Sequence, residues 1–356
     1  MRRIVITGAS GNVGTALLRA LHAAPDEYVI DGVARREPPR TGVFAPVRWH
    51  RLDLAEPDAE RRLVRVFDGV DCVVHLAWGF QPTHAGGYLA AASVGGSTAV
   101  LRAADTAGVG HLLYMSSAGA YAPGAYGRRV DESWPIEGLA TSTYSRSKAA
   151  VEEMLDVYER RHPDDMIVTR MRPGLVVQRA AATGLRRYAF PAYLSPRWLR
   201  FSPVLPVDRR LTVPVVHADD VAAACVAALA RGTRGAFNLS AEPPLRRDDI
   251  AAAMKATPVH VPARLTRSVV NVGWRLRLQP VEPGWVDLAF TVPLLDTTRA
   301  RTVLGWAPRW STADAIADLG LGFRKPAPAA DPVMSKGPAQ AAPAELPDAP
   351  APRYIP

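Results

Sequence analysis

The chain has 356 residues, a hydrophobic content of 48% and a formal net charge of +9. The length fits one large domain or two modest ones, and the composition is that of an ordinary globular protein. No apolar run approaches the roughly 18 residues of a membrane span, and the short run before Gly8 does not suffice for a signal peptide. No block of basic residues or nucleic-acid-binding motif stands out, so we expect a cytoplasmic protein that binds a small anionic molecule and no nucleic acid.

The first half of the chain alternates short β-branched runs with longer Ala/Leu-rich segments. Strands are predicted at residues 3–7, 28–34, 47–52, 71–76, 111–115 and 166–171. Helices are predicted at residues 15–23, 58–67, 97–107 and 144–161, where apolar residues recur at helical spacing. This alternation predicts an α/β fold, a Rossmann-type doubly wound parallel sheet with helices on both faces.

The pattern changes after residue 178. Residues 179–214 are rich in Pro, Arg and aromatic residues, whereas residues 215–240 form another βα-like unit that ends in the strand-like GAFNLS. We therefore predict a dinucleotide-binding domain at 1–178, to which 215–240 return, and a smaller mixed C-terminal substrate-binding region at 179–214 and 241–325. Residues 326–356 are mostly Ala and Pro without periodicity, and we predict that they are disordered.

The two cysteines lie in the apolar segments DCVVHLA and AAACVAALA. Neither Cys72 nor Cys225 has the spacing of a metal site or a redox motif. We expect both to be small core residues, and we expect no bound metal.

The stretch TGASGNVG begins with the last residue of the first predicted strand and is followed by a predicted helix. Gly8 permits a tight turn, Gly11 lets backbone approach a phosphate, and Gly14 lets the helix pack against the strand. The first amides of such a helix bind a pyrophosphate. This context predicts a dinucleotide site made by Gly8, Ser10, Gly11, Asn12, Val13 and Gly14.

The end of the second predicted strand, VARREPPR, bears on which dinucleotide binds. An acidic residue there would bind the free ribose of NAD, whereas an arginine accommodates the 2′-phosphate of NADP. Arg35 and Arg36 therefore favour NADP over NAD, although both could be solvated surface residues, and Asp31 is expected to point elsewhere. Asp53, with Leu54 after the third strand, could bind the adenine amino group or serve in a turn or helix cap.

Seven motifs follow one another along the chain: TGASGNVG, LDL at 52–54, HLA at 75–77, YMSSAGAY at 114–121, YSRSK at 144–148, RPG at 172–174 and VHADDVA at 216–222. This ordered set resembles the extended short-chain dehydrogenase/reductase superfamily, in its NAD(P)-dependent epimerase/dehydratase branch, over residues 3–325. The resemblance implies an NAD(P)-dependent oxidoreductase or epimerase with a small-molecule substrate, and a homodimer is compatible with it.

The resemblance also implies roles for single residues. Tyr144 is the implied acid/base, and Lys148 is implied to lower the pKa of Tyr144 and to hold the nicotinamide ribose. Ser117, with Ser116 as the fallback, is implied to bind the substrate oxygen. The resemblance also implies cofactor contacts at the end of two further strands. These are Leu76, Ala77 and Gly79 at and after the predicted strand 71–76, and Pro173 and Gly174 after the predicted strand 166–171. His75 reads as a buried, hydrogen-bonded residue, and Ser93 stands where relatives carry an Asn that stabilises the site.

The substrate region leaves alternatives open. Residues 179–210 contain seven arginines and five aromatic residues. They would suit a nucleotide sugar, or a bulky apolar carbonyl compound as in steroid- or flavonoid-reductase relatives. They would equally suit a basic cap that packs on the domain or touches a membrane surface or a partner. In dehydratase relatives an Asp–Glu pair follows the Ser/Thr of this motif. Because Ser117 is followed by Ala118 and Gly119, the resemblance argues against a sugar 4,6-dehydratase. A non-catalytic NADP-binding redox sensor is the remaining alternative, but the presence of Ser117, Tyr144 and Lys148 together favours an enzyme.

Overall fold

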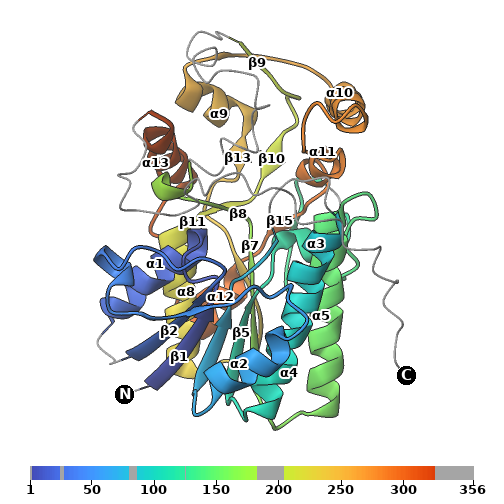
Figure 1. Cartoon of the computed structure of the whole chain (residues 1–356). Coiled ribbons are helices and arrows are strands. Elements are labelled where there is room, and N and C mark those ends of the chain that lie inside the picture. Colours follow the sequence, from blue (N-terminus) through green and yellow to red (C-terminus); the bar gives the residue numbers. More distant parts are fainter. Residues whose placement is uncertain (1, 25–27, 80–85, 125, 183–203, 325–356) are drawn as a thin grey trace.

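The computed structural model describes residues 2–24, 28–79, 86–124, 126–182 and 204–324. A seven-stranded sheet lies between two layers of helices, and a smaller cap covers one end of the strands (Figure 1). The strand order is β3 (Arg48–Arg51), β2 (Tyr28–Ala34), β1 (Arg2–Thr7), β4 (Cys72–His75), β5 (His111–Met115), β7 (Ile167–Pro173) and β12 (Gly235–Leu239), and all neighbours are parallel. The predicted Rossmann-type sheet is confirmed, and its order reverses between β1 and β4, where such folds bind ligands.

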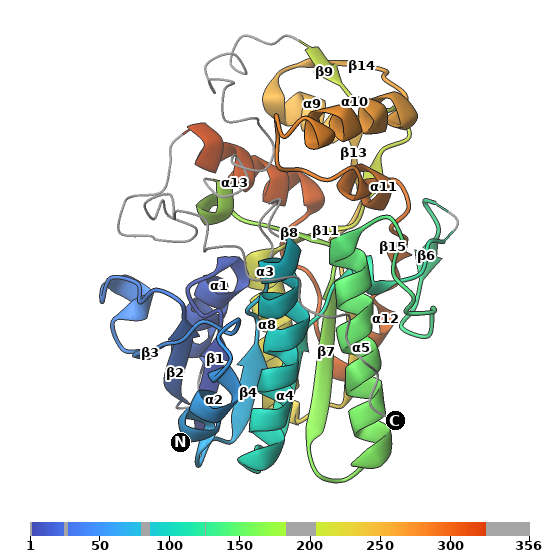
Figure 2. The same ribbon diagram turned by 45° about the vertical axis from the view of Figure 1, so that its right-hand side comes forward.

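Each face of the sheet has its own helices, because successive residues of a strand point to opposite sides. Ile4 and Ile6 of β1 pack with α1 (Asn12–His22), α8 (Ala218–Arg231) and α12 (Thr298–Leu304). Val5 packs on the other side with α2 (Ala59–Phe67), α4 (Gly96–Thr106) and α5 (Thr143–Arg161). Figure 2 shows α4 and α5 in front of the strands. All three β1 side chains are fully buried, so the two cores fix where the strand ends point.

The predicted elements of the first half agree closely with the structure. The predicted helix at 144–161 is observed at Thr143–Arg161, and the predicted strand at 71–76 at Cys72–His75. The first helix begins earlier than predicted, at Asn12, because the extended Gly11 serves as its N-cap. The elements that were not predicted include α3 (Gly86–Ala90) and a π-helical turn, η2 (Ala91–Gly95), which run directly into α4.

The cap is built from segments that follow residue 203. Its parts are β9 (Val204–Pro206) paired with β14 (Thr257–Val259), β10 (Thr212–Val213) paired with β13 (Leu245–Arg246), and helices α9 (Arg247–Met254), α10 (Ala263–Arg275), α11 (Gly284–Ala289) and α13 (Thr312–Arg324). Below the cap, β8 (Leu175–Val177) pairs with β11 (Val215–His217), and β6 (Arg129–Val130) with β15 (Leu294–Leu295). The domain bounds stay predictions; α12 adds a second return to the sheet, where it packs on α8 and β12.

Three further expectations concern the chain as a whole. Cys72 and Cys225 are free and buried in the core, as predicted. Among the described helices, none combines the length and the apolar character needed to cross a bilayer. The predicted disordered segment 326–356 lies outside the described residues.

Candidate active site

Gly8 and Gly14 of the glycine loop lie where the backbone leaves no room for a side chain. Gly8 has a φ of +74°, and a Cβ there would lie 2.7 Å from the backbone nitrogen of Ala77, in the loop after β4. A Cβ on Gly14 would lie 2.5 Å from the carbonyl oxygens of Gly8 and Ala9. Larger residues would therefore push apart the two loops that meet at the carboxyl ends of β1 and β4.

The N-terminus of α1 offers donors to an anion. The backbone amides of Asn12, Val13 and Gly14 have no acceptor among the described residues, as is usual for a first helical turn. The Asn12 side chain faces elsewhere, because its Nδ2 donates to the carbonyl of Val176 at 3.1 Å and its Oδ1 accepts from Gln178 at 2.7 Å. The arrangement fits the pyrophosphate of a dinucleotide, held by backbone rather than by the Asn12 amide.

Asp31 points away from the cofactor end of β2, as expected. Its carboxylate is buried and contacts Arg3 at 3.2 Å, Arg48 at 2.8 Å and His50 at 2.6 Å. Burial would raise the pKa of Asp31, but the hydrogen bonds from His50 and Arg3 lower it below its ordinary value. Asp31 on β2 is therefore a structural counter-ion for residues of the two neighbouring strands, β1 and β3.

Arg35 leaves β2 on the surface and belongs to a small network at the predicted adenosine end. Its Nη1 donates to the Tyr88 hydroxyl at 2.6 Å, and that hydroxyl donates to Asp53 Oδ2 at 2.9 Å. The other Asp53 oxygen accepts from the backbone N–H of Ala55 at 3.1 Å, which is the turn role considered for it. Arg36 is exposed beside them. Sequence reasoning missed Tyr88, which lies on the unpredicted helix α3.

The end of β4 is fixed by a buried chain of hydrogen bonds. His75 contacts Thr7 Oγ1 at 2.7 Å and Ser97 Oγ at 2.9 Å, and burial with the nearby Lys148 charge lowers the pKa of His75 to about 3. The structure thus confirms the reading of His75 as a buried, hydrogen-bonded residue. The backbone N–H of Leu76 donates to the Thr7 carbonyl at 3.0 Å, so the loop that begins there lies against β1.

Ser93 takes part in holding that loop. Its hydroxyl is buried in the π-helical turn η2 and accepts from the backbone N–H of Gly79 at 3.2 Å. A Cβ on Gly79 would lie 3.0 Å from the same hydroxyl, so a small side chain faces a glycine here. π-Helical turns are frequent at functional sites, and this one places a short serine against the loop after β4, at the position where the resemblance implies an Asn.

Tyr144 and Lys148 lie in the first turns of α5, directly after its N-cap residue Ser142. The Ser142 hydroxyl caps the helix by accepting from the backbone N–H of Ser145, so the start of the helix is fixed. Both residues face the end of β5, where Ser117 follows in the turn before η3 (Ala118–Ala120). The structure thereby brings together the three residues that the resemblance assigns to catalysis.

Ser117 and Tyr144 are joined by a hydrogen bond. Ser117 Oγ also accepts from the backbone N–H of Gly119 at 3.0 Å, and a Cβ on Gly119 would lie 3.1 Å from the Tyr144 ring. Burial raises the pKa of Tyr144 to about 12, against the lowering effect of the Ser117 hydrogen bond. The expectation of a lowered pKa for this phenol is therefore wrong for the structure as it stands, because desolvation outweighs its stabilising contacts.

Lys148 is buried beneath an aromatic ring. Its Nζ donates to the carbonyl of Met115 at 2.7 Å and to the Tyr114 hydroxyl at 3.3 Å, and it lies 3.5 Å from the ring centre of Trp78. Burial lowers the pKa of Lys148 well below its ordinary value, and the charge of Glu152 opposes this. Trp78 was not predicted as a site residue.

Glu152 continues the face of α5 that carries Tyr144 and Lys148, one further turn along. Its fully buried carboxylate accepts from Arg172 Nε at 2.8 Å and Nη2 at 2.9 Å, in a bidentate pair. Arg172 lies on β7 immediately before Pro173. The pair fixes α5 against the strand, and it places a negative charge on the inner side of Lys148.

A second tryptophan lies beside Tyr144, supplied by the cap. The Trp285 ring centre is 5.0 Å from that of Tyr144, and Trp78 makes an edge contact with Tyr144 at 6.2 Å. Glu282 accepts from the backbone N–H of Thr143 at 2.8 Å, and a Cβ on Gly284 would lie 2.2 Å from the carbonyl oxygen of Thr141. These contacts dock the start of α11 on the start of α5 and so hold Trp285 over Tyr144.

Pro173 and Gly174 lie at the end of β7, close to the cap. The backbone N–H of Gly174 donates to the Leu239 carbonyl at 3.0 Å, and a Cβ there would lie 2.3 Å from the carbonyl oxygen of Pro214. Gly174 is thus needed where the chain crosses from the sheet to the cap. Its predicted contact with a nicotinamide remains a prediction, as does that of Pro173.

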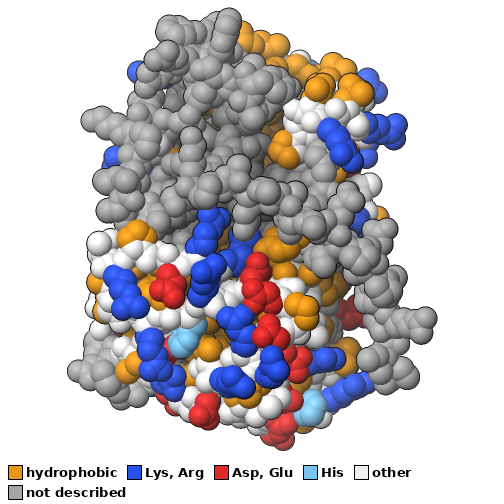
Figure 3. Space-filling model, viewed as in Figure 1, with side chains coloured by type: hydrophobic (Ala, Val, Ile, Leu, Met, Phe, Trp, Pro, Cys, Tyr) orange, Lys and Arg blue, Asp and Glu red, His pale blue; other side chains and the backbone are white. Residues whose placement is uncertain are grey.

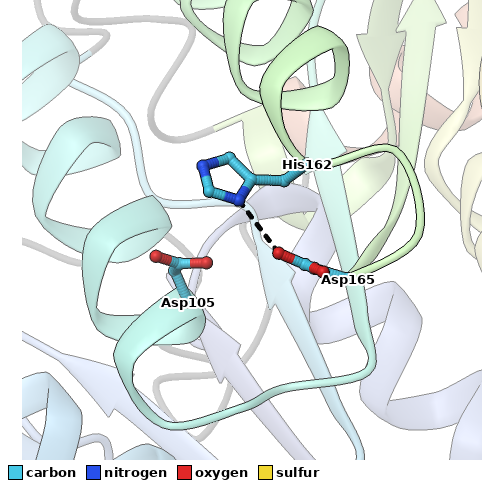
Figure 4. A group of neighbouring side chains, drawn as sticks. All are labelled: Asp105, His162 and Asp165. Atoms are coloured by element: carbon cyan, nitrogen blue, oxygen red, sulfur yellow. Dashed lines mark hydrogen bonds and ion pairs between the residues drawn. The ribbon is translucent and has the colours of Figure 1, made fainter.

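One cluster with the donor atoms of a metal site lies elsewhere. Asp105, His162 and Asp165 lie together at the far end of α5 from Tyr144 (Figure 4). His162 contacts Asp165 at 2.9 Å, and Asp105 accepts from the Tyr158 hydroxyl at 2.8 Å. The carboxylates therefore have partners within the protein, and we assign the cluster to the packing of α4 against α5.

Comparison with known proteins agrees with this geometry. The model of the NAD dependent epimerase/dehydratase family matches residues 4–240. A sterol-4-alpha-carboxylate 3-dehydrogenase (decarboxylating) of Saccharomyces cerevisiae is 28% identical over 52% of this chain and 55% of its own, so that match spans about half of the relative. A 2'-dehydrokanamycin reductase of Streptomyces kanamyceticus is 30% identical over 73% of this chain and 70% of its own.

Solved structures share the fold. The UDP-glucose 4-epimerase of Thermotoga maritima superposes with a TM-score of 0.68 and 19% identity, over 91% of this chain and 99% of that one. This likeness covers the cap as well as the sheet. On the match of the family model over most of the sheet domain and on the reductase relative, the chain belongs to the NAD dependent epimerase/dehydratase family.

Proposed function

We propose that the protein is an NAD(P)-dependent reductase or dehydrogenase of a bulky, largely apolar carbonyl or carbinol compound. The observation that carries this proposal is the ring of Trp285, 5.0 Å from Tyr144 on a helix docked to the start of α5. Trp78 and Leu288 add apolar surface around Tyr144 and the adjoining Gly119. Such a wall suits a flat apolar ring next to one reacting oxygen.

The residues present fit a bound dinucleotide. The first-turn amides of α1 would hold its pyrophosphate, and Lys148 its nicotinamide ribose. When bound, the nicotinamide supplies or accepts the hydride at the reacting carbon. The protein's own part is to bind the substrate oxygen and to move one proton.

Ser117 and Tyr144 are placed for that task. Both hydroxyls can donate to a carbonyl oxygen, and they stabilise the negative charge that develops on it. A phenol with a pKa of about 12 is protonated at neutral pH, so Tyr144 holds the proton that the reduced oxygen must receive. The protonated phenol is the form that carbonyl reduction requires.

The test of this mechanism is Tyr144→Phe. Removal of the hydroxyl should lower kcat by about 10²–10⁴-fold with little change in NADPH affinity. Tyr158→Phe is the matched control, because it removes a hydroxyl from the same helix that donates to Asp105 far from the site. Equal turnover by Tyr144→Phe and wild type would refute the role of Tyr144.

The substrate panel that goes with this test pairs fused-ring ketones with UDP-sugars. Oxidation of NADPH by a ketone, followed at the nicotinamide absorbance, supports a reductase. Trp285→Ala should then raise KM for the ring ketone by tenfold or more, since a buried aromatic contact is worth a few kcal/mol.

NADP is the cofactor we propose over NAD. The carboxylate of Asp31 on β2 is bound by three basic partners, whereas Arg35 is exposed directly after the end of the strand. Arg35→Ala should weaken NADPH binding at least tenfold and leave NADH binding nearly unchanged. Arg40→Ala, an exposed arginine a few residues on, is the control. Tighter binding of NADH by the wild type would overturn this assignment.

A nucleotide-sugar epimerase is the second candidate. The observation in its favour is the basic cap, in which Arg209 and Arg210 lie near Arg264. Arg186, Arg187, Arg197 and Arg200, which the sequence interpretation also used, lie outside the described residues. Conversion of a UDP-sugar into its epimer without net change in the dinucleotide would favour this candidate over the reductase.

A further inference from the structure

The outward face of α10 is apolar. Leu265, Val269, Val272 and Leu276 recur at the spacing that places side chains on one face of a helix, and they are 54–66% exposed. The opposite face carries Val270 and Trp274, which are partly buried. We call the four exposed residues the α10 apolar stripe. A continuous row of solvated aliphatic side chains marks an interaction surface.

Basic side chains border the α10 apolar stripe. Residues 259–281 contain four arginines and neither Asp nor Glu. Arg264, Arg275 and Arg277 are exposed and pair with no described carboxylate, whereas Arg267 pairs with Asp287 of α11 at 2.6 Å. Figure 3 shows hydrophobic and basic side chains next to one another over α10. The surface is therefore complementary to a partner that is apolar and anionic at once.

A basic cavity lies beside the first turn of α10. It has a volume of about 390 Å³ and is lined by Asp208, Arg209, Arg210, His260, Pro262 and Arg264. The Asp208 carboxylate is already occupied, because it accepts from Arg210 Nη2 at 3.1 Å and from the backbone N–H of Ala263 at 2.9 Å. The remaining charge of the lining is positive and suits a phosphate group.

We propose that this face of the cap docks on a membrane surface that contains anionic phospholipids. The α10 apolar stripe would enter the boundary between headgroups and acyl chains, and the flanking arginines would contact lipid phosphates. An exposed apolar face with basic residues beside it is the pattern of helices that lie in the membrane interface. The unpaired arginines and the absence of acidic residues in 259–281 favour lipid over a protein partner.

Docking has one consequence for the site, and this consequence rests on the proposed function. The Arg267–Asp287 ion pair links α10 to α11, and α11 carries Trp285 beside Tyr144. A protein held by α10 would thus present its aromatic wall close to apolar compounds dissolved in the bilayer. Binding to lipid itself needs no turnover, so the test below is independent of the substrate proposal.

The experiment is sedimentation of the full chain with vesicles of phosphatidylcholine, alone or mixed with phosphatidylglycerol. We expect binding to the mixed vesicles to be at least tenfold tighter and to weaken as salt is raised. The double change Val269→Asp and Val272→Asp should lower that affinity tenfold or more, and Arg275→Gln about fivefold. The controls are Val303→Asp on α12 and Arg160→Gln on α5, which are exposed elsewhere and should bind like wild type.

Three results would overturn the proposal. The first is no binding to mixed vesicles, and the second is equal loss in the α10 variants and the controls. The third is a dimer in the absence of lipid that Val269→Asp with Val272→Asp converts to a monomer, because the stripe would then be an interface between two copies. Unchanged thermal unfolding of the variants by circular dichroism shows that lost binding does not come from lost folding.

Discussion

Replacement of Glu152 by Gln is the change whose effect follows most directly from the structure. The Glu152 carboxylate is fully buried and is bound on both oxygens by the guanidinium of Arg172, itself nearly buried. Glutamine keeps the shape of the side chain but removes its charge. The arginine would then remain in the interior without its counter-ion, since the strand that carries it cannot move to solvent.

The burial of this ion pair sets the expected loss in the free energy of unfolding. Loss of one partner of a buried ion pair costs about 3–5 kcal/mol, far more than the 0–1 kcal/mol of an exposed pair. A loss of about 3 kcal/mol raises the unfolded fraction roughly a hundredfold. The charge of Glu152 also opposes the lowering of the Lys148 pKa by burial, so its loss should lower that pKa further and shift the pH dependence of turnover.

The assay is urea unfolding followed by circular dichroism, with Glu153→Gln as the matched control. Glu153 is the next residue of the same helix and is exposed, so its change removes the same charge and should alter the free energy of unfolding by less than about 0.5 kcal/mol. Equal unfolding midpoints for the two variants would refute the reasoning.

The same comparison has a defined pH dependence. Burial would raise the pKa of Glu152, but the hydrogen bond and charge of Arg172, with Arg170, lower it below the ordinary 4.5. A carboxyl group with a lowered folded pKa contributes stability above its unfolded pKa and loses it as the pH falls through the folded pKa. The difference between wild type and Glu152→Gln should therefore be constant down to about pH 4.5 and shrink below it.

Two further substitutions test the cofactor loops. Gly8→Ala should abolish dinucleotide binding and lower the free energy of unfolding by about 3 kcal/mol or more, because the new Cβ would lie 2.7 Å from the backbone nitrogen of Ala77. Gly42→Ala is the control, because Gly42 has a similar positive φ but open space around it. It should lower the free energy of unfolding by only about 1 kcal/mol in the same assay. Ser93→Ala removes the hydroxyl that accepts from the backbone N–H of Gly79, and it should lower the free energy of unfolding by about 1 kcal/mol. The Kd for NADPH, measured by fluorescence titration, should rise several-fold. An unchanged Kd would show that the Ser93 contact does not shape the loop.

The resemblance identified the three catalytic candidates, and the structure gives them a physical setting that the sequence did not contain. Tyr144 and Lys148 are four residues apart, so the helix alone places them on one face. The raised pKa of Tyr144 depends instead on burial by surrounding residues, including Trp285 from a helix more than a hundred residues later. Spacing along a helix predicts which side chains point the same way, but it does not predict how far the rest of the protein shields them from water.

The sequence alone determined the features that depend on neighbouring residues. The strand Arg2–Thr7, the turn at Gly8 and the helix after it follow from β-branched residues, glycine spacing and apolar periodicity. The strand was predicted to within one residue, whereas the helix begins three residues before its predicted start. Local backbone preference and side-chain period suffice for such elements, because each is stabilised within one short segment.

Tertiary structure decided which distant side chains meet. Trp78 over Lys148, Trp285 beside Tyr144 and Tyr88 between Arg35 and Asp53 join segments that share no periodic pattern. These contacts depend on how α3, α11 and the loop after β4 pack on the rest of the protein, and that packing is a sum of many small dispersion and hydrogen-bond contributions. The sequence shows which residues are apolar, but not which of these distant segments pack against each other. The apolar wall beside Tyr144 arises from that packing.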